Sequence, residues 1–495
     1  LGDVYKRQGY ARAQSDEEIQ KITDAMPAKP RIEPAKPRKL LVFNLCTGFA
    51  HSAIPYGAKA FEIMGAKTGA FEVTQSSDPA VFAPDSLAQF DAVVMNNTTG
   101  TLFEDPVLKH SLLDFVKGGK GIVGVHAATD CFYDWPEYGE MMGGYFDGHP
   151  WGSGDTVTVK LDDPGHALCA AFGGQGFDVN DEIYQIKGPY SRDVLRVLMS
   201  LDTSEGTKTN MNKGNAIHRK DGDFGVSWVR SWGDGRVFYC SLGHNHHIFW
   251  TPKLLQYYLD GIQFALGDLP AETTPSAQLP EDYAKASAAR AREQALDNIL
   301  AEIVSYEFGN SRERFTELND LVIASQDDPA FRRAIARKLA DTLAKETTLE
   351  CKQFLCRQLY LIGTEEEVPA IAALLTAPDT YDMARYALER MPGAAPCKAL
   401  MDALGKVDGG LKVGVINSLG ERRNEQVVPQ LTALMDDLDP LVAGAAIAAL
   451  GKIGTDSAAA ALDAALKRAS PERLPDIADA YLACAEAALR EGRQS

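Results

Sequence analysis

The sequence changes character near residue 285, and this change restricts the possible folds more than any other feature. Before that point, short apolar runs alternate with amphipathic stretches, and glycine and aromatic residues are frequent. After it, alanine and leucine recur at helical spacing and aromatic residues become sparse. With 495 residues, the chain is too long for one core, since domains usually hold about 100–200 residues. We therefore predict an α/β domain followed by an all-helical domain.

The α/β domain is predicted to cover residues 38–268. Runs such as LLVFNLC, DAVVMNN and GIVGV are short and apolar, as expected of buried parallel strands. Amphipathic helical stretches separate them, and strands that alternate with helices indicate a parallel sheet with helices on both faces. Two later runs, DTVTVKL and GRVFYCSLG, are expected to extend the sheet. A helix over residues 254–266 closes the domain.

The second half of the chain is predicted to be a helical-repeat domain over residues 291–495, after a Pro- and Thr-rich linker over residues 269–290. The segment LDPLVAGAAIAALGKIG resembles a HEAT-like repeat. Each repeat is expected to be a helix, a tight turn and a second helix, which bury their apolar faces only against neighbouring repeats. The turns are expected at four glycines: Gly363, Gly393, Gly420 and Gly454.

The N-terminal 37 residues are predicted to lie outside both domains. LGDVYKRQGY has no structural period and is typical of a scar left by assembly, and residues 14–38 are polar and Pro-rich, as in an extended leader. Ala11, Arg12 and Ala13 match the small-x-small end of a secretory signal, although the apolar segment that should precede them is absent. If they are a cleavage site, the protein is periplasmic or secreted. If the match is accidental, a cytoplasmic protein is expected.

Composition excludes several classes of function. The formal net charge of −18 would repel nucleic acid and anionic membranes, and no apolar run reaches the ~18 residues that span a bilayer. No GxGxxG motif follows a strand, so we expect no NAD site. The eight cysteines are scattered in apolar contexts without a CxxC pair, which indicates buried thiols.

Histidines mark the α/β domain as the chemical one, because all nine precede residue 250. His51, His126 and His244 each follow the end of a predicted strand, the edge where open parallel sheets bind ligands. His149 lies in the Gly- and aromatic-rich loop GGYFDGHPWG, and Glu182 lies in DVNDEIYQI. Imidazoles with a carboxylate suit a divalent ion such as zinc or manganese, which could polarise a carbonyl group. The four histidines are the predicted metal ligands.

Further site residues are predicted from the same loops. The catalytic candidates are His126, Asp130 and Glu182, and the substrate-binding candidates are Asn97, Asp134, Tyr145 and Trp151. The two aromatic rings could stack on a sugar or belong to the core. Glu182 could be a ligand or a solvated loop acid, and His246 or His247 could replace His244. His110, His166 and His218 are more typical of surface or packing positions.

The motif GIVGVHAATDCFYDWPEYGEMMGGYFDGHPW resembles the signature of the ThuA-like family, named for trehalose utilisation. TGFAHSAI, VNDEIYQI and GRVFYCSLGH resemble its further motifs in the same order, over about residues 38–268. The resemblance implies a flavodoxin-like three-layer α/β sandwich similar to class I glutamine amidotransferases. Those enzymes carry a nucleophilic Cys on a sharp strand-to-helix turn, where this chain has His126. A hydrolase built on Cys131 is therefore the weaker interpretation.

The resemblance also implies a role in bacterial disaccharide catabolism through 3-keto-glycosides. A ketone at C3 acidifies the C2 proton, so that a base and a Lewis acid could expel the C1 substituent by β-elimination, or by net hydrolysis if water adds back. We expect a sugar or keto-sugar substrate, with a protein partner on the repeats. The alternative is a non-catalytic carbohydrate-binding or scaffold protein whose helical repeats dock partners.

Overall fold

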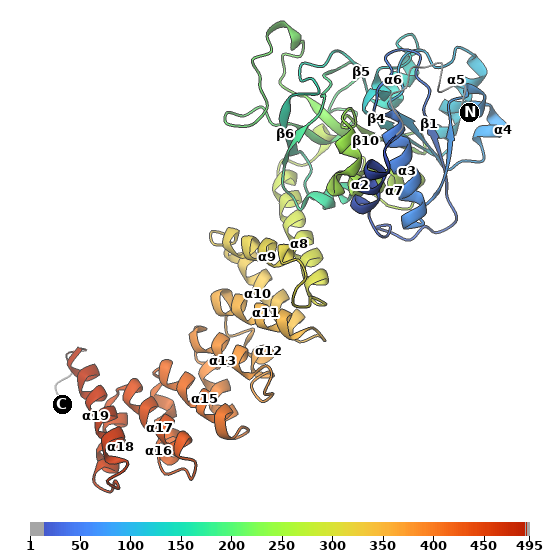
Figure 1. The fold of residues 1–495 in the computed structure, drawn as a ribbon. Helices are drawn as coiled ribbons and strands as arrows, with labels where there is room; N and C mark the ends of the chain where they lie inside the picture. Colours follow the sequence, from blue (N-terminus) through green and yellow to red (C-terminus); the bar gives the residue numbers. More distant parts are fainter. Residues whose placement is uncertain (1–13, 491, 493–495) are drawn as a thin grey trace. The chain divides into compact units, whose positions relative to one another are not determined.

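The protein consists of two compact units, Leu1–Ala295 and Leu296–Ser495. The computed structural model describes residues 14–490 and 492. The first unit is an α/β domain and the second contains helices, which confirms the predicted fold class (Figure 1). Among the described residues, no helix combines the length and the apolar character needed to cross a membrane. All eight cysteines are buried and none forms a disulfide, as their apolar contexts predicted.

A nine-stranded mixed sheet forms the centre of the α/β domain, in the order β2-β1-β3-β4-β11-β10-β9-β6-β7. Its strands are β1 (Lys39–Phe43), β2 (Glu72–Ser76), β3 (Ala92–Asn96), β4 (Gly121–Val125), β6 (Thr156–Leu161), β7 (Phe177–Asn180), β9 (Arg196–Leu201), β10 (Gly225–Trp232) and β11 (Gly235–Cys240). A separate two-stranded sheet pairs β5 (Tyr145–Phe146) with β8 (Ile186–Lys187).

Only one half of the large sheet is parallel, which differs from the expected parallel sheet. From β2 to β11 in the sheet order, all neighbouring strands pair in parallel. From β11 onward, through β10, β9, β6 and β7, all neighbouring strands pair antiparallel. The reversal begins at the hairpin between β10 and β11, where Gly233 has a φ of +60°. A two-residue turn can join only antiparallel strands, so this short connection fixes the direction of the second half.

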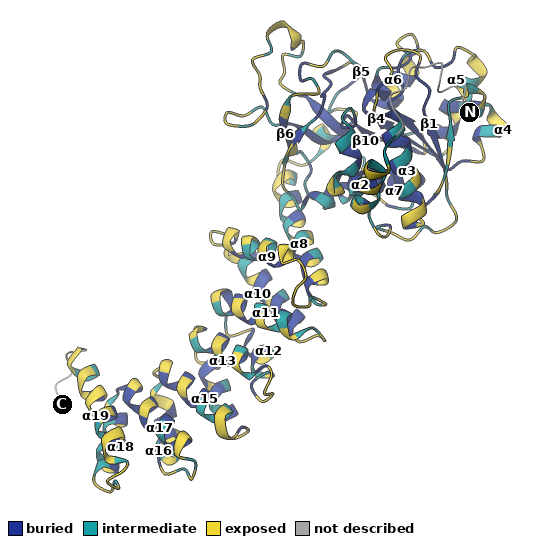
Figure 2. Ribbon diagram, viewed as in Figure 1, coloured by how far each residue is buried: buried dark blue, intermediate teal, exposed yellow. Residues whose placement is uncertain are grey.

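Helices cover both faces of the sheet, and successive residues of the central strands enter two different cores. Leu40 and Val42 of β1 pack on the side of α3 and α7, whereas Leu41 and Phe43 pack on the side of α5 and α6. These helices are α3 (Ile54–Thr68), α5 (Pro106–Lys117), α6 (Pro136–Met142) and α7 (Pro252–Leu266). Figure 2 shows the buried strands between helices whose outer sides are exposed. The period of two along each strand produces this three-layer arrangement.

The leader is not simply extended, since it contains helix α2 (Asp16–Ala25). Ser15 and Glu18 form a reciprocal capping box at its start, and Ile22 is fully buried in the core that contains α3 and α7. The first proline of the chain is residue 27, so no proline interrupts residues 16–25. The polar composition of this stretch is compatible with a capped amphipathic helix, which was not predicted from the sequence. Ala11, Arg12 and Ala13 lie outside the described residues.

The predicted linker is in large part attached to the α/β domain. The Thr274 carbonyl accepts a hydrogen bond from Arg196, which also forms a buried ion pair with Asp163 at 2.6 Å. Asp163 in turn accepts a hydrogen bond from Ser287. Ser287 belongs to helix α8 (Tyr283–Ile303), which spans the boundary between the two units. Residues that follow the predicted last helix of the α/β domain therefore contribute to the packing of this domain.

A fragment that ends at Ala295 is expected to unfold like the α/β domain of the full chain, whereas one that ends at Pro270 should be less stable. The shorter fragment leaves Asp163 and Arg196 with buried polar atoms that lack partners, at a cost of about 1–3 kcal/mol each. All five tryptophans precede residue 251, so tryptophan fluorescence in urea reports this domain alone. Equal midpoints for the two fragments would contradict the expectation, and Ser287→Ala in the full chain isolates the contact to Asp163.

The second unit contains a succession of helices that pack in pairs, as the repeats predicted. Its helices after α8 are α9 (Glu313–Ala324), α10 (Pro329–Leu343), α11 (Leu349–Ile362), α12 (Val368–Ala372), α13 (Tyr381–Arg390), α14 (Ala395–Leu404), α15 (Gly409–Glu421), α16 (Val428–Leu434), α17 (Pro440–Ile453), α18 (Asp456–Leu466) and α19 (Leu474–Arg490). Gly363, Gly393 and Gly454 lie at helix ends or between helices. Gly420 instead lies inside α15, where a Cβ atom would come within 3.0 Å of Ala449 on α17. It permits two helices to approach closely and does not form a turn.

Candidate metal and catalytic centre

The predicted histidines meet at the edge of the sheet where the parallel strands end. His126 directly follows β4, His51 lies in the loop after β1, and His244 lies in the loop after β11. His126 has a φ of +44°, a value that non-glycine residues rarely adopt. Its Nδ1 lies 2.7 Å from the Ser241 carbonyl, which can only accept a hydrogen bond. The proton therefore resides on Nδ1 and the lone pair of Nε2 is free.

Glu182 lies at the centre of this histidine cluster. Its Oε1 is 3.6 Å from His126 Nε2 and 3.8 Å from His244 Nε2, and its Oε2 is 3.5 Å from His149 Nδ1. The rings of His51, His126 and His244 are 5.0–5.4 Å apart between centroids. Donor atoms of His51, His126 and Glu182 all lie within 4.8 Å of one another, as ligands of one ion would. The structure thus brings the four predicted histidines and Glu182 together.

Burial keeps the imidazoles of His51 and His126 neutral. It lowers the pKa of His51 to about 2, with the neighbouring histidines acting in the same direction. Burial also lowers the pKa of His126, which is fully enclosed. For Glu182, burial is the largest single influence and would raise the pKa, but His126, His244 and His149 together outweigh it, and the carboxyl pKa falls below its usual value. Neutral imidazoles beside an ionised carboxylate are the protonation states in which these side chains bind metal ions.

Two donor atoms of the cluster are orphaned. His51 Nδ1 and His126 Nε2 are buried and have no hydrogen-bond partner among the described residues. Buried polar atoms are otherwise almost always paired, because leaving one unpaired costs about 1–3 kcal/mol. A divalent ion would satisfy both atoms, and nitrogen donors with one carboxylate match the ligand preference of zinc or manganese. The residues present therefore fit a metal.

Asp181 holds the loop that carries His244. The Asp181 carboxylate is fully buried and accepts hydrogen bonds from the backbone N–H groups of Gly243 at 2.7 Å, His244 at 3.3 Å and Asn245 at 2.6 Å. Burial raises the pKa of this carboxyl to about 7 even though the three donors oppose the shift. Because Asp181 precedes Glu182, one short segment positions both the carboxylate and the third imidazole of the cluster.

Asp181→Ala is expected to weaken metal binding by about 10–100-fold, as the loss of outer-shell support commonly does. The three N–H groups would lose their acceptor, and the loop of His244 would no longer be fixed. Isothermal titration of metal-free protein with zinc measures the change. Asp178→Ala is the matched control, because Asp178 is exposed on neighbouring β7 and contacts Thr158. Unchanged zinc affinity in Asp181→Ala would refute this role.

Three of the predicted substrate-binding residues are buried and one is exposed. Trp151 is fully buried, donates a hydrogen bond to the Asn210 carbonyl and packs against Phe224, so it belongs to the core and cannot stack on a sugar. Tyr145 is also buried, and its hydroxyl donates to the Trp135 carbonyl. Asn97 is buried behind the cluster with a φ of +51° and donates to the Gly243 carbonyl. Asp134 is exposed.

Asp130 and Cys131 are separate from the contacts around Glu182. Asp130 accepts a hydrogen bond of 2.5 Å from Tyr133, and burial raises the pKa of its carboxyl. Cys131 is fully buried, its thiol donates to the Thr98 carbonyl, and burial raises its pKa far above the usual value. A thiol in this state is not a nucleophile. His126 occupies the sharp turn after β4, and a Cys-based hydrolase does not fit this site.

The remaining histidines have structural contacts. His166 caps a short helix and contacts the Glu272 carbonyl, and His246 stacks on Tyr56 with its Nε2 2.9 Å from Ser52. His244 and not His246 therefore joins the cluster. His247 is part of the short helix that follows. His218 forms an ion-pair contact with Asp147 and is considered further below.

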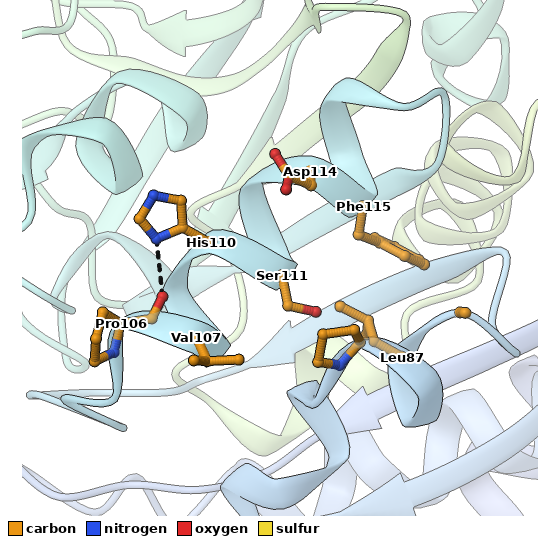
Figure 3. A pocket seen from close by; sticks show the side chains of 9 residues that line it. Leu87, Pro106, Val107, His110, Ser111, Asp114 and Phe115 are labelled. Carbon is orange, nitrogen blue, oxygen red and sulfur yellow. Dashed lines mark hydrogen bonds between the residues drawn. The ribbon is translucent and has the colours of Figure 1, made fainter.

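A surface pocket of about 470 Å³ between α4 (Pro84–Leu87) and α5 is a competing site (Figure 3). Its lining includes His110, Ser111 and Asp114, the residue types of a hydrolytic triad. His110 Nδ1 is 2.9 Å from the Pro106 carbonyl, and Figure 3 shows the three side chains pointing apart. No hydrogen bond joins them in the described part of the chain, so this pocket lacks a nucleophile–base pair.

Two aromatic residues of the site were missed by sequence reasoning. The Tyr184 hydroxyl lies 3.4 Å from His51 Nε2, and the Tyr184 ring is 4.3 Å from that of His126. Phe49 packs edge-on against His51 at 4.9 Å while 67% of the residue remains exposed. The motifs TGFAH and NDEIY contain both residues, and their proximity to His51 and Glu182 in sequence was the available signal.

Two regions of the chain match models of known protein families. Residues 39–265 match the family described as ThuA, trehalose utilisation, and residues 397–480 match HEAT repeats. A ThuA-like protein from Bacteroides uniformis is 20% identical, with a TM-score of 0.38, and the match covers 48% of this chain and 94% of that one. For a ThuA-like protein from Parabacteroides merdae the values are 17%, 0.37, 50% and 95%. No curated protein matches the chain. The chain therefore joins a region that matches the ThuA family model, at residues 39–265, to a region that matches HEAT repeats, at residues 397–480.

Proposed function

We propose that the ThuA-family domain cleaves 3-keto-glycosides with the help of a divalent metal ion. The observation that carries the proposal is the convergence of three imidazoles and a carboxylate, with two orphaned nitrogen atoms, at the carboxyl edge of the parallel strands. We assign His51, His126, His244 and Glu182 as the metal ligands. When bound, the ion would supply a Lewis acid for the ketone oxygen.

The sequence predicted His149 as a metal ligand, and we assign it a different role. Its Nδ1 faces Oε2 of Glu182, whereas His126 and His244 face Oε1. Its side chain is 51% exposed, in contrast to the enclosed ring of His126. An accessible imidazole oriented by a carboxylate is suited to general-base catalysis. We therefore assign to His149 the removal of the C2 proton.

The reaction then proceeds as an elimination, and water can add to the unsaturated product. As His149 takes the C2 proton, the C1=C2 bond forms and the C1–O bond to the aglycone breaks. Water can add to C1 while the proton returns to C2, which gives net hydrolysis. The enclosed position of His51, His126 and Glu182 excludes bulk water from the charges that must be stabilised.

Metal removal tests the proposal. Full-length protein treated with a chelator is expected to lose glucose release from 3-keto-trehalose and to regain it with zinc or manganese. Protein that holds no metal and binds sugar tightly without turnover would instead support the alternative of a carbohydrate-binding or scaffold protein. The HEAT repeats are compatible with a protein partner in either case. Because they contain no histidine, we expect them to be dispensable for the chemistry.

A further inference from the structure

His218 lies beside the catalytic loop, on the long segment between β9 and β10. The fully buried side chain of Gln185 joins this segment to the loop of His149. Gln185 Nε2 donates to the carbonyls of Asp147 and Ala216, at 2.9 and 2.7 Å, and its Oε1 accepts from the backbone N–H of His218 at 2.8 Å. One buried amide, three residues after Glu182, thus fixes His218 next to the site.

The His218 imidazole forms a pair with Asp147. Its Nδ1 is 3.1 Å from Asp147 Oδ2, and about half of the side chain is exposed. The ring lies against Gly148, the residue before His149: a Cβ atom at Gly148 would be 3.9 Å from His218 Cε1. Gly148 has a φ of +102°, which favours glycine, and a Cβ atom there would also come within 3.2 Å of Gln185 Nε2. No hydrogen bond occupies His218 Nε2 in residues 14–490.

We propose that His218 donates the proton to the departing glycosidic oxygen, with Asp147 as its positioning residue. This inference rests on the proposed function. A sugar alkoxide is a poor leaving group, so breaking the C1–O bond needs an acid, which typically contributes about 10²–10⁴-fold. A carboxylate on Nδ1 fixes the tautomer and directs Nε2 outward, as in other His–carboxylate pairs.

The proton balance closes over one turnover. His149 takes the C2 proton, and His218 gives its Nε2 proton to the leaving oxygen as the C1–O bond breaks. When water adds at C1, His218 recovers a proton from that water, and His149, whose exposed imidazole exchanges its proton with solvent, gives a proton to C2. Two imidazoles thus divide the base and acid roles, and neither requires an external oxidant or reductant.

Leaving-group dependence tests the role of His218. Full-length His218→Gln is compared with the unaltered protein on 3-keto-trehalose and on 4-nitrophenyl 3-keto-glucoside, whose leaving group needs no protonation. The kcat/KM for 3-keto-trehalose is expected to fall about 100-fold or more, and that for the nitrophenyl substrate less than about tenfold. Asp147→Asn should also lower kcat/KM more for 3-keto-trehalose than for the nitrophenyl substrate, but by a smaller factor. The loss should lie in kcat and not in KM.

His110→Ala is the matched control, because His110 is an exposed imidazole on α5. Metal content and tryptophan fluorescence verify that each variant is folded and loaded. Equal losses on the two substrates, or no loss on 3-keto-trehalose, would overturn the role of His218 alone. If the unaltered protein cleaves neither 3-keto substrate, the proposed function fails and the inference fails with it.

Discussion

Replacing His126 by alanine is expected to remove most of the bound metal and to reduce turnover of 3-keto-trehalose at least about 1,000-fold, as loss of a group essential in the transition state does. His126 contributes the most enclosed donor of the cluster, and the Ser241 carbonyl fixes the tautomer that exposes its lone pair. His246 is not positioned to replace it, since its ring is held by Ser52 and Tyr56. Elemental analysis of purified protein measures the metal content.

His166→Ala is the matched control for this variant. His166 is also buried, but its imidazole contacts Leu168 and the Glu272 carbonyl, outside the cluster. Both substitutions remove a buried ring, so both should lower the free energy of unfolding, and only His126→Ala should lose metal. Equal metal content in the two variants would refute the assignment of His126 as a ligand.

The second large effect is selectivity for the oxidised sugar: trehalose itself is expected not to be cleaved under conditions in which 3-keto-trehalose is consumed. Without the neighbouring ketone, the C2 proton is far less acidic, and an imidazole at neutral pH cannot remove it. A Lewis acid adds discrimination, since it stabilises only the oxygen that gains charge in the transition state. Substitutions of His51 or His244 should therefore lower kcat more than they change KM.

The two sugars are offered side by side in deuterated water, and release of glucose is followed. Elimination through His149 predicts solvent deuterium at C2 of the 3-keto product. Equal cleavage of both sugars, or absence of deuterium at C2, would contradict the elimination route. His149→Ala should abolish the exchange of the C2 proton even in the presence of bound metal, which separates the base from the ligands.

The sequence predicted the parts of the site that follow from strand ends. His51, His126 and His244 could be expected to meet because parallel strands end at a common edge, and this edge depends only on strand order and direction. The division of roles could not be predicted. His149 could face Oε1 of Glu182, as His126 and His244 do, or Oε2. The choice depends on the conformation of a loop with several positive-φ glycines, and such a loop has no periodic sequence pattern.

The sequence left open whether Trp151 stacks on a sugar or belongs to the core, for a related reason. Its position depends on the 202–224 segment, which supplies Asn210 and Phe224 around the ring and has almost no regular structure. The antiparallel half of the sheet was also missed, because β9 is buried throughout and shows no alternation of polar and apolar residues. Helix α2 was missed because its capping box lies in a stretch of otherwise polar composition.

The position of β11 has a consequence for how the chain folds during synthesis. β11 is the last strand of the sheet in sequence, yet it lies in the middle, between β4 and β10. Until residues 235–240 emerge from the ribosome, the edge of β4 lacks its final neighbour, and unpaired strand edges promote aggregation. The same insertion delivers His244 to His51 and His126, which were synthesised more than 100 residues earlier. Nascent chains arrested before residue 235 are therefore expected to be protease-sensitive and to bind chaperones, and protection should arise in one step once β11 joins the two halves.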